Sequence, residues 1–553
     1  MTPIDKAALK TVTIAAAAVL AAVALAACGS GGSSAPSPTT PVSSWVTSTP
    51  AGTGAVDSVK WDLPYGEPST LDWLRSASFS ENTVLGNLCE SLIRLGPDFN
   101  YEPGLAKSWR SPNPTTWVYE LQPGLKFSDG KPVTTADVIY SLERNRNPKL
   151  GSYWEPWFAR VQSITATGPE QITVKLKQPD ALFNEFLATA GGVVGEKSYI
   201  EQKGSKYGTS EGGVMCVGPY ELTNWTPGKG IVITANPDYW RKSEAPKVKS
   251  IDYSFVTDGQ TLANALTSGE ISGTYEAPLV SWPSLLASGT GHGFTGKSTA
   301  YDSIDFTEKH GPTQNVDFRR ALSLVIDRKA VAASIFHGAA EPIRSEFFPA
   351  TWGYAREVYK KGYEELPSLE QNLAEAKRLV AKVPGMRPVT MLTNSDDEAA
   401  KQLAAYVQSE ARKAGIEIVL KELPAAQYIA AAFEKSRLKQ YDLSLNTTGY
   451  LDLAEPVEWA YITLISSGIF NSSGYDNPSV NKWSAEAREA LDPTKRAELM
   501  VKVEAQAYGT DVDSIPIVSP AERLYMSSKI TGATPSLTPL LYAPWARALG
   551  AAG

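Results

Sequence analysis

The stretch "PVTMLTNSDDEAAKQLAAYVQSEARKAGIEIVL", Pro388–Leu420, indicates an α/β fold. Residues 388–393 predict a strand, and residues 416–420 alternate in the manner of a second strand. Between them, residues 398–414 are rich in alanine and predict a helix that Gly415 stops. Two strands joined through a helix by short connections predict a right-handed crossover in a largely parallel sheet.

An amphipathic helix is predicted just before this unit. Ser368 and Gln371 have the spacing of a capping box, and Pro384 and Gly385 mark the end of the helix. Four apolar residues fall on one helical face: Leu369, Leu373, Ala376 and Val380. The pattern before about residue 300 is different, with short β-rich pieces broken by turns. The two halves of the chain therefore differ in their expected architecture.

The N-terminus predicts export and lipid anchoring. Lys6 and Lys10 precede an uncharged apolar run at residues 12–24, which is the pattern of a secretory signal and is shorter than the about 20 residues that span a bilayer. The following "LAAC", Leu25–Cys28, resembles a bacterial lipobox, so we expect residues 1–27 to be removed and Cys28 to carry acyl chains such as palmitate. The alternative is an ordinary cleaved signal with an incidental cysteine. We expect a lipoprotein on the extracytoplasmic face of the cell membrane, held by lipid alone.

Residues 28–55 predict a flexible tether. They are uncharged and dominated by Gly, Ser, Thr and Pro, so they cannot bury a core, and this composition is typical of an extended, flexible linker. Beyond this segment no run of 18 or more apolar residues occurs, so no membrane-spanning helix is expected.

Composition excludes several classes of function. The formal charge of −7 does not suit nucleic-acid binding. Only three histidines occur, at 292, 310 and 337, without the spacing of a zinc motif, so neither a metal site nor a cofactor is predicted. Apart from Cys28, the chain has Cys89 and Cys216, and in an exported protein an even pair predicts a disulfide. Two isolated buried thiols are the alternative.

Four long stretches, in this order and spacing, resemble the dipeptide and oligopeptide substrate-binding lipoproteins of bacterial ABC importers, solute-binding protein family 5. The resemblance extends over residues 59–528. The stretches are "PGLAKSW" (Pro103–Trp109), "TWVYELQPGLKFSDGKPVTTADVIYSLER" (Thr116–Arg144), "GPYELTNWTPGKGIVITANPDYW" (Gly218–Trp240) and "NVDFRRALSLVIDRKAV" (Asn315–Val331).

The resemblance implies a two-lobed α/β fold, the periplasmic-binding-protein-like fold of type II in its enlarged peptide-binding class. Lobe I is expected to hold residues 56–300 and 516–553, and lobe II residues 301–515. Hinge segments are expected near 301–306 and 515–518, where the chain passes between the lobes.

The same resemblance implies a monomeric binding protein, not an enzyme, which captures short peptides and delivers them to an ABC permease and its ATPases. The same fold adapted to haem, a nickel chelate or glutathione remains an alternative. Scarce histidine argues against nickel held by side chains, whereas tyrosine can ligate haem iron. The motif "GTSEG", Gly208–Gly212, matches the G-x-S-x-G of esterases, but its polar flanks do not predict a nucleophile elbow.

The stretch "DLAEP", Asp452–Pro456, is similar to the family's D-x-x-[DE]-P, in which the aspartate pairs with the α-ammonium of a peptide. The resemblance therefore makes Asp452 the expected amine anchor, and a partly buried carboxylate suits that role. The alternative is that Asp452 only complements the N-terminus of a helix that begins at Pro456. The other residues expected to contact ligand are Tyr450, Trp459, Gly218 and Tyr220.

Overall fold

The computed structural model describes residues 45–76, 78–432, 434–536 and 542–553. The predicted signal peptide, the lipidation site Cys28 and the first part of the predicted tether lie outside the described residues. Within the described ranges, no helix combines the length and the apolar character that crossing a bilayer requires.

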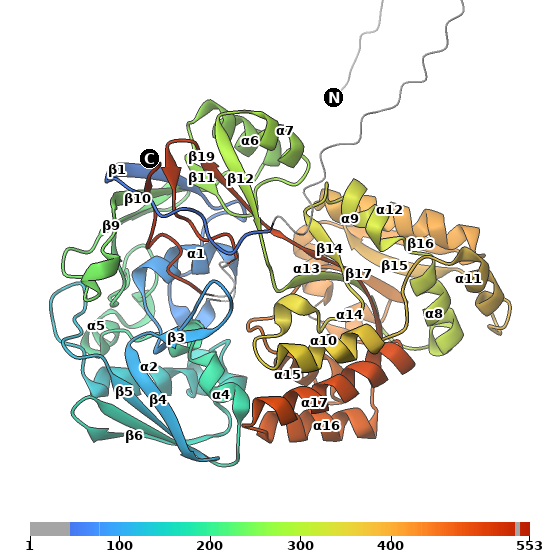
Figure 1. Ribbon diagram of the computed structural model, residues 1–553, viewed down its shortest axis with the longest axis horizontal. Helices are drawn as coiled ribbons and strands as arrows, with labels where there is room; N and C mark the ends of the chain where they lie inside the picture. The colour runs from blue at the N-terminus through green and yellow to red at the C-terminus, as the bar shows by residue number, and fades with distance from the viewer. Residues whose placement is uncertain (1–44, 77, 433, 537–541) are drawn as a thin grey trace, which may run out of the picture. The chain divides into compact units, whose positions relative to one another are not determined.

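The first of two large sheets has seven strands in the order β12-β19-β11-β1-β10-β9-β8 (Figure 1). Strand β1 lies parallel to β10 and β11, and β19, from the C-terminal part of the chain, pairs antiparallel with β11 and β12. The two ends of the described chain thus share one sheet. The strands are β1 (Val56–Asp62), β8 (Tyr220–Thr226), β9 (Gly230–Ala235), β10 (Val248–Ser254), β11 (Gly273–Thr274), β12 (Gly291–Gly296) and β19 (Glu522–Ser527).

The second large sheet has six strands in the order β14-β18-β13-β17-β15-β16. Its strands are β13 (Ala300–Phe306), β14 (Ala340–Pro342), β15 (Val389–Asn394), β16 (Ile418–Leu423), β17 (Leu443–Tyr450) and β18 (Ser514–Pro520). The parallel pair β15 and β16, joined through the helix α12 (Glu398–Lys413), confirms the strand, helix and strand predicted from the sequence. Both expected hinge segments lie in paired strands, since β13 and β18 are antiparallel neighbours.

Three smaller sheets complete the strand pairing of the described residues. One has four strands, in the order β4-β5-β7-β6, and the other two are pairs, β2 with β3 and β20 with β21. Their strands are β2 (Ile93–Leu95), β3 (Tyr101–Pro103), β4 (Ala106–Asn113), β5 (Thr116–Leu121), β6 (Val161–Gly168), β7 (Gln171–Leu176), β20 (Ile530–Thr531) and β21 (Gly550–Ala551).

The other helices are α1 (Phe79–Leu88), α2 (Thr135–Asn145), α3 (Glu155–Phe158), α4 (Ala181–Phe186), α5 (Lys197–Lys203), α6 (Gly259–Ser268), α7 (Trp282–Ala287), α8 (Val316–Leu324), α9 (Arg328–Ser334), α10 (Arg356–Glu365), α11 (Leu373–Val380), α13 (Ala425–Ala432), α14 (Lys435–Leu438), α15 (Pro456–Trp459), α16 (Pro478–Glu489) and α17 (Pro493–Glu504). The predicted start of the helix near Ser368 is wrong, because α11 begins at Leu373. Asn372 caps it by accepting the backbone N–H of Glu375 at 3.0 Å. Gln371 instead donates to the carbonyl of Val325 at 2.9 Å.

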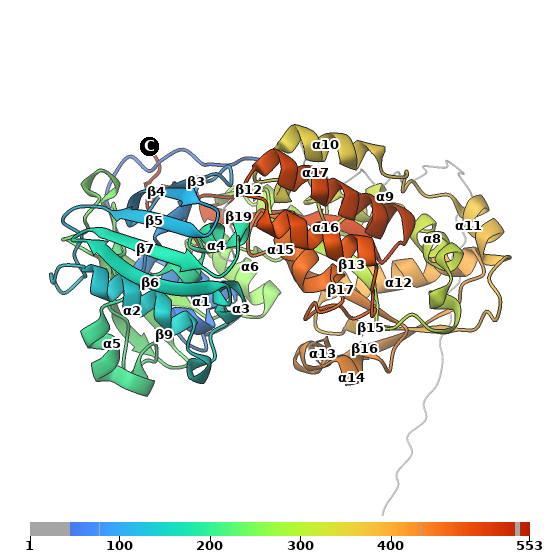
Figure 2. The ribbon, with the colours of Figure 1, turned by 90° about the horizontal axis from the view of Figure 1, so that it is seen from below.

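The hydrophobic core of the first sheet continues into the C-terminal helices. One cluster of buried residues includes Trp61 of β1, Trp73 and Trp154 together with Val457 of α15 and Met500 of α17. Helices α16 and α17 pack on each other, and α16 also contacts α4 (Figure 2). A separate cluster of buried apolar residues packs between the second sheet and its helices, with members from β13, β15 and α12. Segments distant in sequence therefore share the larger core.

Two further contacts tie the chain ends and loops to this core. Cys89 and Cys216 form a disulfide that closes a loop with a sequence separation of 127. Residues 45–54, the last part of the predicted tether, pack on other segments: the Val46 N–H donates to the Thr295 carbonyl at 2.8 Å, and Gly54 forms a β-bridge with Ala551. This part of the tether is bound to the folded body rather than extended away from it.

Candidate functional site

A cavity of about 390 Å³ lies beside strands β13 and β17, within the size range of small-molecule pockets. Its walls come from the second sheet, from the segment that follows β17 and from Tyr153 in the N-terminal half. The lining residues are Tyr153, Tyr301, Asp305, Phe306, Glu346, Tyr428, Ala432, Lys435, Leu438, Ser444, Asn446, Gly449, Tyr450, Asp452, Trp459, Ile462, Thr463, Leu464, Ile469, Phe470, Ser472, Ser473, Asp513 and Ser514.

Asp452 lies at one end of this cavity, just after β17. Its side chain accepts a hydrogen bond from the Tyr153 hydroxyl at 2.9 Å, and the residue is 7% exposed. Burial raises the pKa of the Asp452 carboxyl to about 6, although the hydrogen bond from Tyr153 opposes the rise. No Lys, Arg or His of the described chain forms an ion pair with Asp452. The carboxylate is therefore available to a cation that enters the cavity.

Glu458 fixes the backbone that carries Asp452. Its carboxylate accepts the backbone N–H groups of Asp452 at 3.2 Å and of Leu453 at 2.9 Å, and its side chain is fully buried. Burial, and next the negative charge of Asp452, raise the pKa of Glu458 well above its usual value. Two backbone hydrogen bonds to one rigid group hold the loop, so the direction of the Asp452 side chain is set by its surroundings.

The helix after Asp452 has a different capping residue. Glu455 precedes α15 and accepts the backbone N–H of Val457 at 3.0 Å, while Pro456 occupies the first helical position. The alternative was that Asp452 complements the N-terminus of this helix. In the structure Glu455 is the carboxylate that caps it. The side-chain partner of Asp452 is Tyr153 from the other half of the chain.

Tyr450 and Trp459 also line the cavity, as expected from the sequence. The Trp459 indole donates to the Glu346 carboxylate, and its ring meets Tyr301 edge to face with centroids 5.1 Å apart. Burial raises the pKa of the Tyr450 hydroxyl, so this side chain stays neutral. Together with Asp452, these two aromatic residues form one end and one wall of the cavity.

Gly218 and Tyr220 do not belong to the cavity lining. Gly218 packs on the chain near α1, where an added Cβ would lie 2.2 Å from the Leu88 carbonyl oxygen. Tyr220 begins β8 and is 1% exposed within the core. The disulfide at Cys216 holds the same loop against Cys89. Gly218 and Tyr220 are thus packed against other parts of the protein. Their positions do not support the expectation that they contact ligand.

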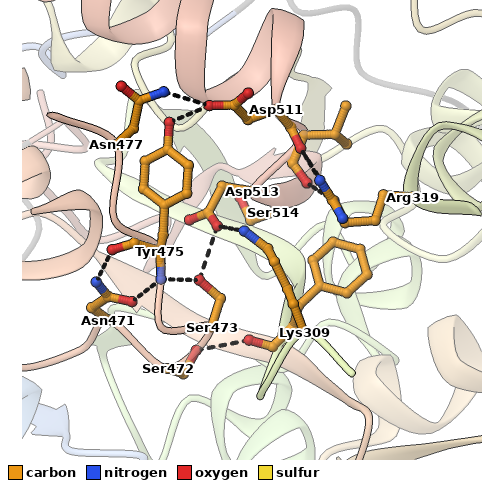
Figure 3. Close-up of polar contacts among 12 residues, drawn as sticks. Lys309, Arg319, Asn471, Ser472, Ser473, Tyr475, Asn477, Asp511, Asp513 and Ser514 are labelled. Atoms are coloured by element: carbon orange, nitrogen blue, oxygen red, sulfur yellow. Dashed lines mark hydrogen bonds and ion pairs between the residues drawn. The ribbon is translucent and has the colours of Figure 1, made fainter. Parts of the chain in front are cut away.

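Sequence reasoning missed the opposite end of the cavity. There Asp513 forms an ion pair with Lys309 and accepts a hydrogen bond from the Ser473 hydroxyl at 2.9 Å (Figure 3). Behind it, Asp511 accepts hydrogen bonds from Tyr475 at 2.6 Å and Asn477 at 3.0 Å. No local motif marks these residues, because the segments that carry them meet only in the folded chain.

The lining is acidic overall. It contains four carboxylates, at residues 305, 346, 452 and 513, against a single lysine, Lys435, and no arginine or histidine among the described lining residues. Lys435 is exposed, and its ammonium lies 3.5 Å from the Gly468 carbonyl. Among the described residues, no group of three or more His, Cys, Asp or Glu side chains is arranged to hold a metal ion. The arrangement is suited to binding a cationic group by charge and hydrogen bonding.

Comparisons with known proteins agree with this description. The family model of the bacterial extracellular solute-binding proteins, family 5, matches residues 100–471, more than half of the chain. The oligopeptide-binding protein OppA of Bacillus subtilis (strain 168) is 24% identical over 462 residues, which cover 78% of this chain and 82% of that protein. The glutathione-binding protein GsiB of Escherichia coli O6:K15:H31 is 24% identical over 453 residues, covering 78% of this chain and 83% of that protein. These relatives are binding proteins rather than enzymes.

Solved structures show the same fold. The oligopeptide-binding protein AppA from Bacillus subtilis, in complex with a nonapeptide, has a TM-score of 0.73 at 18% identity, covering 90% of this chain and all of that one. The ABC transporter substrate-binding protein CtaP from Listeria monocytogenes has a TM-score of 0.78 at 19% identity, covering 90% and 99%. The fold is thus the predicted two-lobed α/β fold, and the chain belongs to the bacterial extracellular solute-binding proteins of family 5.

Proposed function

We propose that the protein is a lipid-anchored extracytoplasmic component of a peptide ABC importer, which captures short peptides in the cavity and delivers them to the permease. The observation that carries the proposal is Asp452, a buried carboxylate at the cavity end whose side-chain hydrogen-bond donor is the neutral Tyr153 hydroxyl. The α-ammonium of a peptide supplies the missing positive charge, and the enclosed site strengthens their attraction.

Two kinds of observation support the peptide as ligand. The relatives OppA and GsiB are named for binding oligopeptides and glutathione, and AppA was solved with a nonapeptide. The cavity also offers broad aromatic and apolar walls, such as Phe306, Tyr428 and Ile462, that accept varied side chains. Membrane anchoring rests on the sequence alone, through the lipobox that ends at Cys28.

Binding is proposed to couple to closure of the two lobes, with lobe I at residues 56–300 and 516–553 and lobe II at 301–515. Tyr153 belongs to the first of these lobes and Asp452 to the second, and their hydrogen bond joins the two. A ligand that contacts both sides stabilises the closed arrangement by its preference for that state.

Native mass spectrometry of the soluble protein, purified from rich medium without refolding, tests the proposal. Enclosed peptides are expected to appear as a series of added masses, and synthetic peptides are expected to exchange with them. A single discrete added mass, such as haem or a metal chelate, would contradict peptide binding. The same conclusion follows from a cavity that stays empty when peptides are supplied.

The affinity for peptides is expected to depend on pH through Asp452. Its neighbours Tyr153, Tyr450 and Glu458 carry no positive charge, and burial raises the pKa of Asp452 to about 6. Below that pH the free protein holds a proton that must leave before an ammonium can pair. Affinity should therefore fall by about tenfold per pH unit below 6, and fall again above about 8 as the peptide amine loses its proton.

Isothermal titration calorimetry between pH 4.5 and pH 9 measures this profile. The Asp452→Asn variant is the control, because it lacks the group whose protonation limits binding on the acid side. An affinity of the unchanged protein that is constant between pH 4.5 and 6 would contradict the assignment of Asp452.

A further inference from the structure

The cavity extends along two antiparallel strands, with a carboxylate at each end. Near one end the Leu451 N–H, next to Asp452, donates to the carbonyl of Thr299. At the other end Asp305 of β13 pairs with Ser444 of β17. At about 3.3 Å per residue, the extended segment from residue 299 to residue 305, most of it in β13, measures on the order of 20 Å, the length of an extended peptide of about six residues.

Two acidic residues, Asp305 and Asp513, lie at the end distant from Asp452, and one of them has a cationic partner. Asp513 forms the ion pair with Lys309 (Figure 3). Asp305, in contrast, accepts from the Ser303 hydroxyl at 2.7 Å and from the Asn446 amide at 3.3 Å. Both donors are neutral, so the negative charge of Asp305 is solvated but not balanced.

Glu346 has the same character and is more deeply buried, at 3% exposure. Its carboxylate accepts from the Trp459 indole, from the Tyr508 hydroxyl at 2.9 Å and from the Ser514 hydroxyl at 2.6 Å. Within the described residues neither Asp305 nor Glu346 has a Lys, Arg or His within ion-pair distance. A half-buried carboxylate, Asp305, and a buried one, Glu346, therefore line one cavity without a positive charge from the described protein residues.

The absence of a nearby cation is reflected in raised pKa values for both Asp305 and Glu346. Burial raises the pKa of Asp305 to about 6, and the nearby charge of Asp513 adds to the rise. Burial, with the charge of Asp305, raises the pKa of Glu346 to about 8. The tyrosines that face them, Tyr301, Tyr428 and Tyr508, are neutral. A cation from the ligand would favour the charged form of both carboxylates, because an opposite charge nearby lowers their pKa values.

We propose that the cavity selects peptides that carry a lysine or arginine side chain toward their C-terminal end, and that this cation lies against Asp305 and Glu346 while the α-ammonium pairs with Asp452. This selectivity rests on the proposed function, since it names a class of peptide for the same cavity. Lys435, the single lysine of the lining, is exposed to solvent, so its charge is screened and does not neutralise Asp305 and Glu346.

Calorimetric titration with hexapeptides tests the selectivity. Each peptide contains alanine and either one lysine or one norleucine, which has a similar length and no charge, at positions two to six in turn. At one of the later positions lysine is expected to bind at least about tenfold more tightly than norleucine. At position two the preference for lysine should be smaller, because that side chain lies far from Asp305 and the Asp452 carboxylate is already paired with the α-ammonium.

Two variants locate the effect. In Asp305→Asn the ratio of lysine to norleucine affinity should fall severalfold, because asparagine retains hydrogen-bonding groups and loses the charge, while Glu346 remains. Glu308→Gln, a half-exposed position near the end of β13 and outside the cavity lining, should keep the full preference.

The outcomes separate this inference from the function on which it rests. Equal affinity for lysine and norleucine peptides at every position would overturn the selectivity and leave peptide binding intact. So would a preference that Asp305→Asn does not change. Failure of every peptide to bind would overturn the proposed function and the selectivity together.

Discussion

Replacement of Asp452 by asparagine is expected to lower the affinity for short peptides by about 30-fold to 1,000-fold. The reason is that the variant leaves the α-ammonium of the ligand enclosed without a balancing negative charge. Asparagine is close in size to aspartate and can still accept the hydrogen bond from Tyr153. The variant should also fold normally, because the side-chain partner of Asp452 is the neutral Tyr153 hydroxyl and the substitution leaves no buried cation unpaired.

Calorimetric titration with the same peptide measures this loss, and urea unfolding confirms that the variant is folded. Asp476→Asn is a matched control, since Asp476 is an exposed aspartate on the loop before α16 and lies outside the cavity lining. An affinity of the Asp452 variant within about threefold of the unchanged protein would rule out the amine-anchor role, because a buried charge pair is worth more than that.

Replacement of Arg496 by methionine is expected to lower the free energy of unfolding by about 3–5 kcal/mol. Arg496 of α17 lies 3.0 Å from the carboxylate of Glu185 in α4 and 3.6 Å from that of Glu455, and its guanidinium stacks over the Tyr354 ring at 4.0 Å. All three charged side chains are less than one-tenth exposed. Methionine keeps most of the volume but leaves two carboxylates buried without a cation.

Urea unfolding followed by circular dichroism provides the measurement. Lys329→Met is the control, because Lys329 pairs with Glu370 at 3.3 Å where both side chains are about four-fifths exposed, and such pairs add little stability. Adding Glu185→Gln to Arg496→Met should recover part of the loss, since it removes one unbalanced charge. A loss below about 1 kcal/mol for Arg496→Met would show that the two carboxylates do not depend on this arginine.

Local patterns predicted those elements whose formation depends on neighbouring residues. The unit of β15, α12 and β16 formed as expected, because strand alternation and the stop at Gly415, with its φ of +86°, are local properties. The helix start at Ser368 was wrong for the opposite reason. Gln371 has the spacing of a capping box but is held by the carbonyl of Val325, a partner distant in sequence.

The candidate site was predicted in part. Asp452, Tyr450 and Trp459 were named from a motif and its neighbours, and they line the cavity. Gly218 and Tyr220 were named from a stretch that resembles the family, yet here Gly218 packs on α1 near the disulfide and Tyr220 is buried in the core. A match to a family motif does not determine whether its residues reach the cavity, because their distance from the cavity depends on how other segments pack.

The sequence alone thus determined the α/β class, the family and the amine-anchor hypothesis, because these depend on periodicity and on motifs whose residues are close along the chain. Only the tertiary structure brought the Tyr153 hydroxyl to Asp452 across 299 residues and placed Asp305, Glu346 and Asp513 around one cavity. The charge of a binding site depends on residues that folding brings together from distant segments. A local sequence pattern does not show which side chains will line the same cavity.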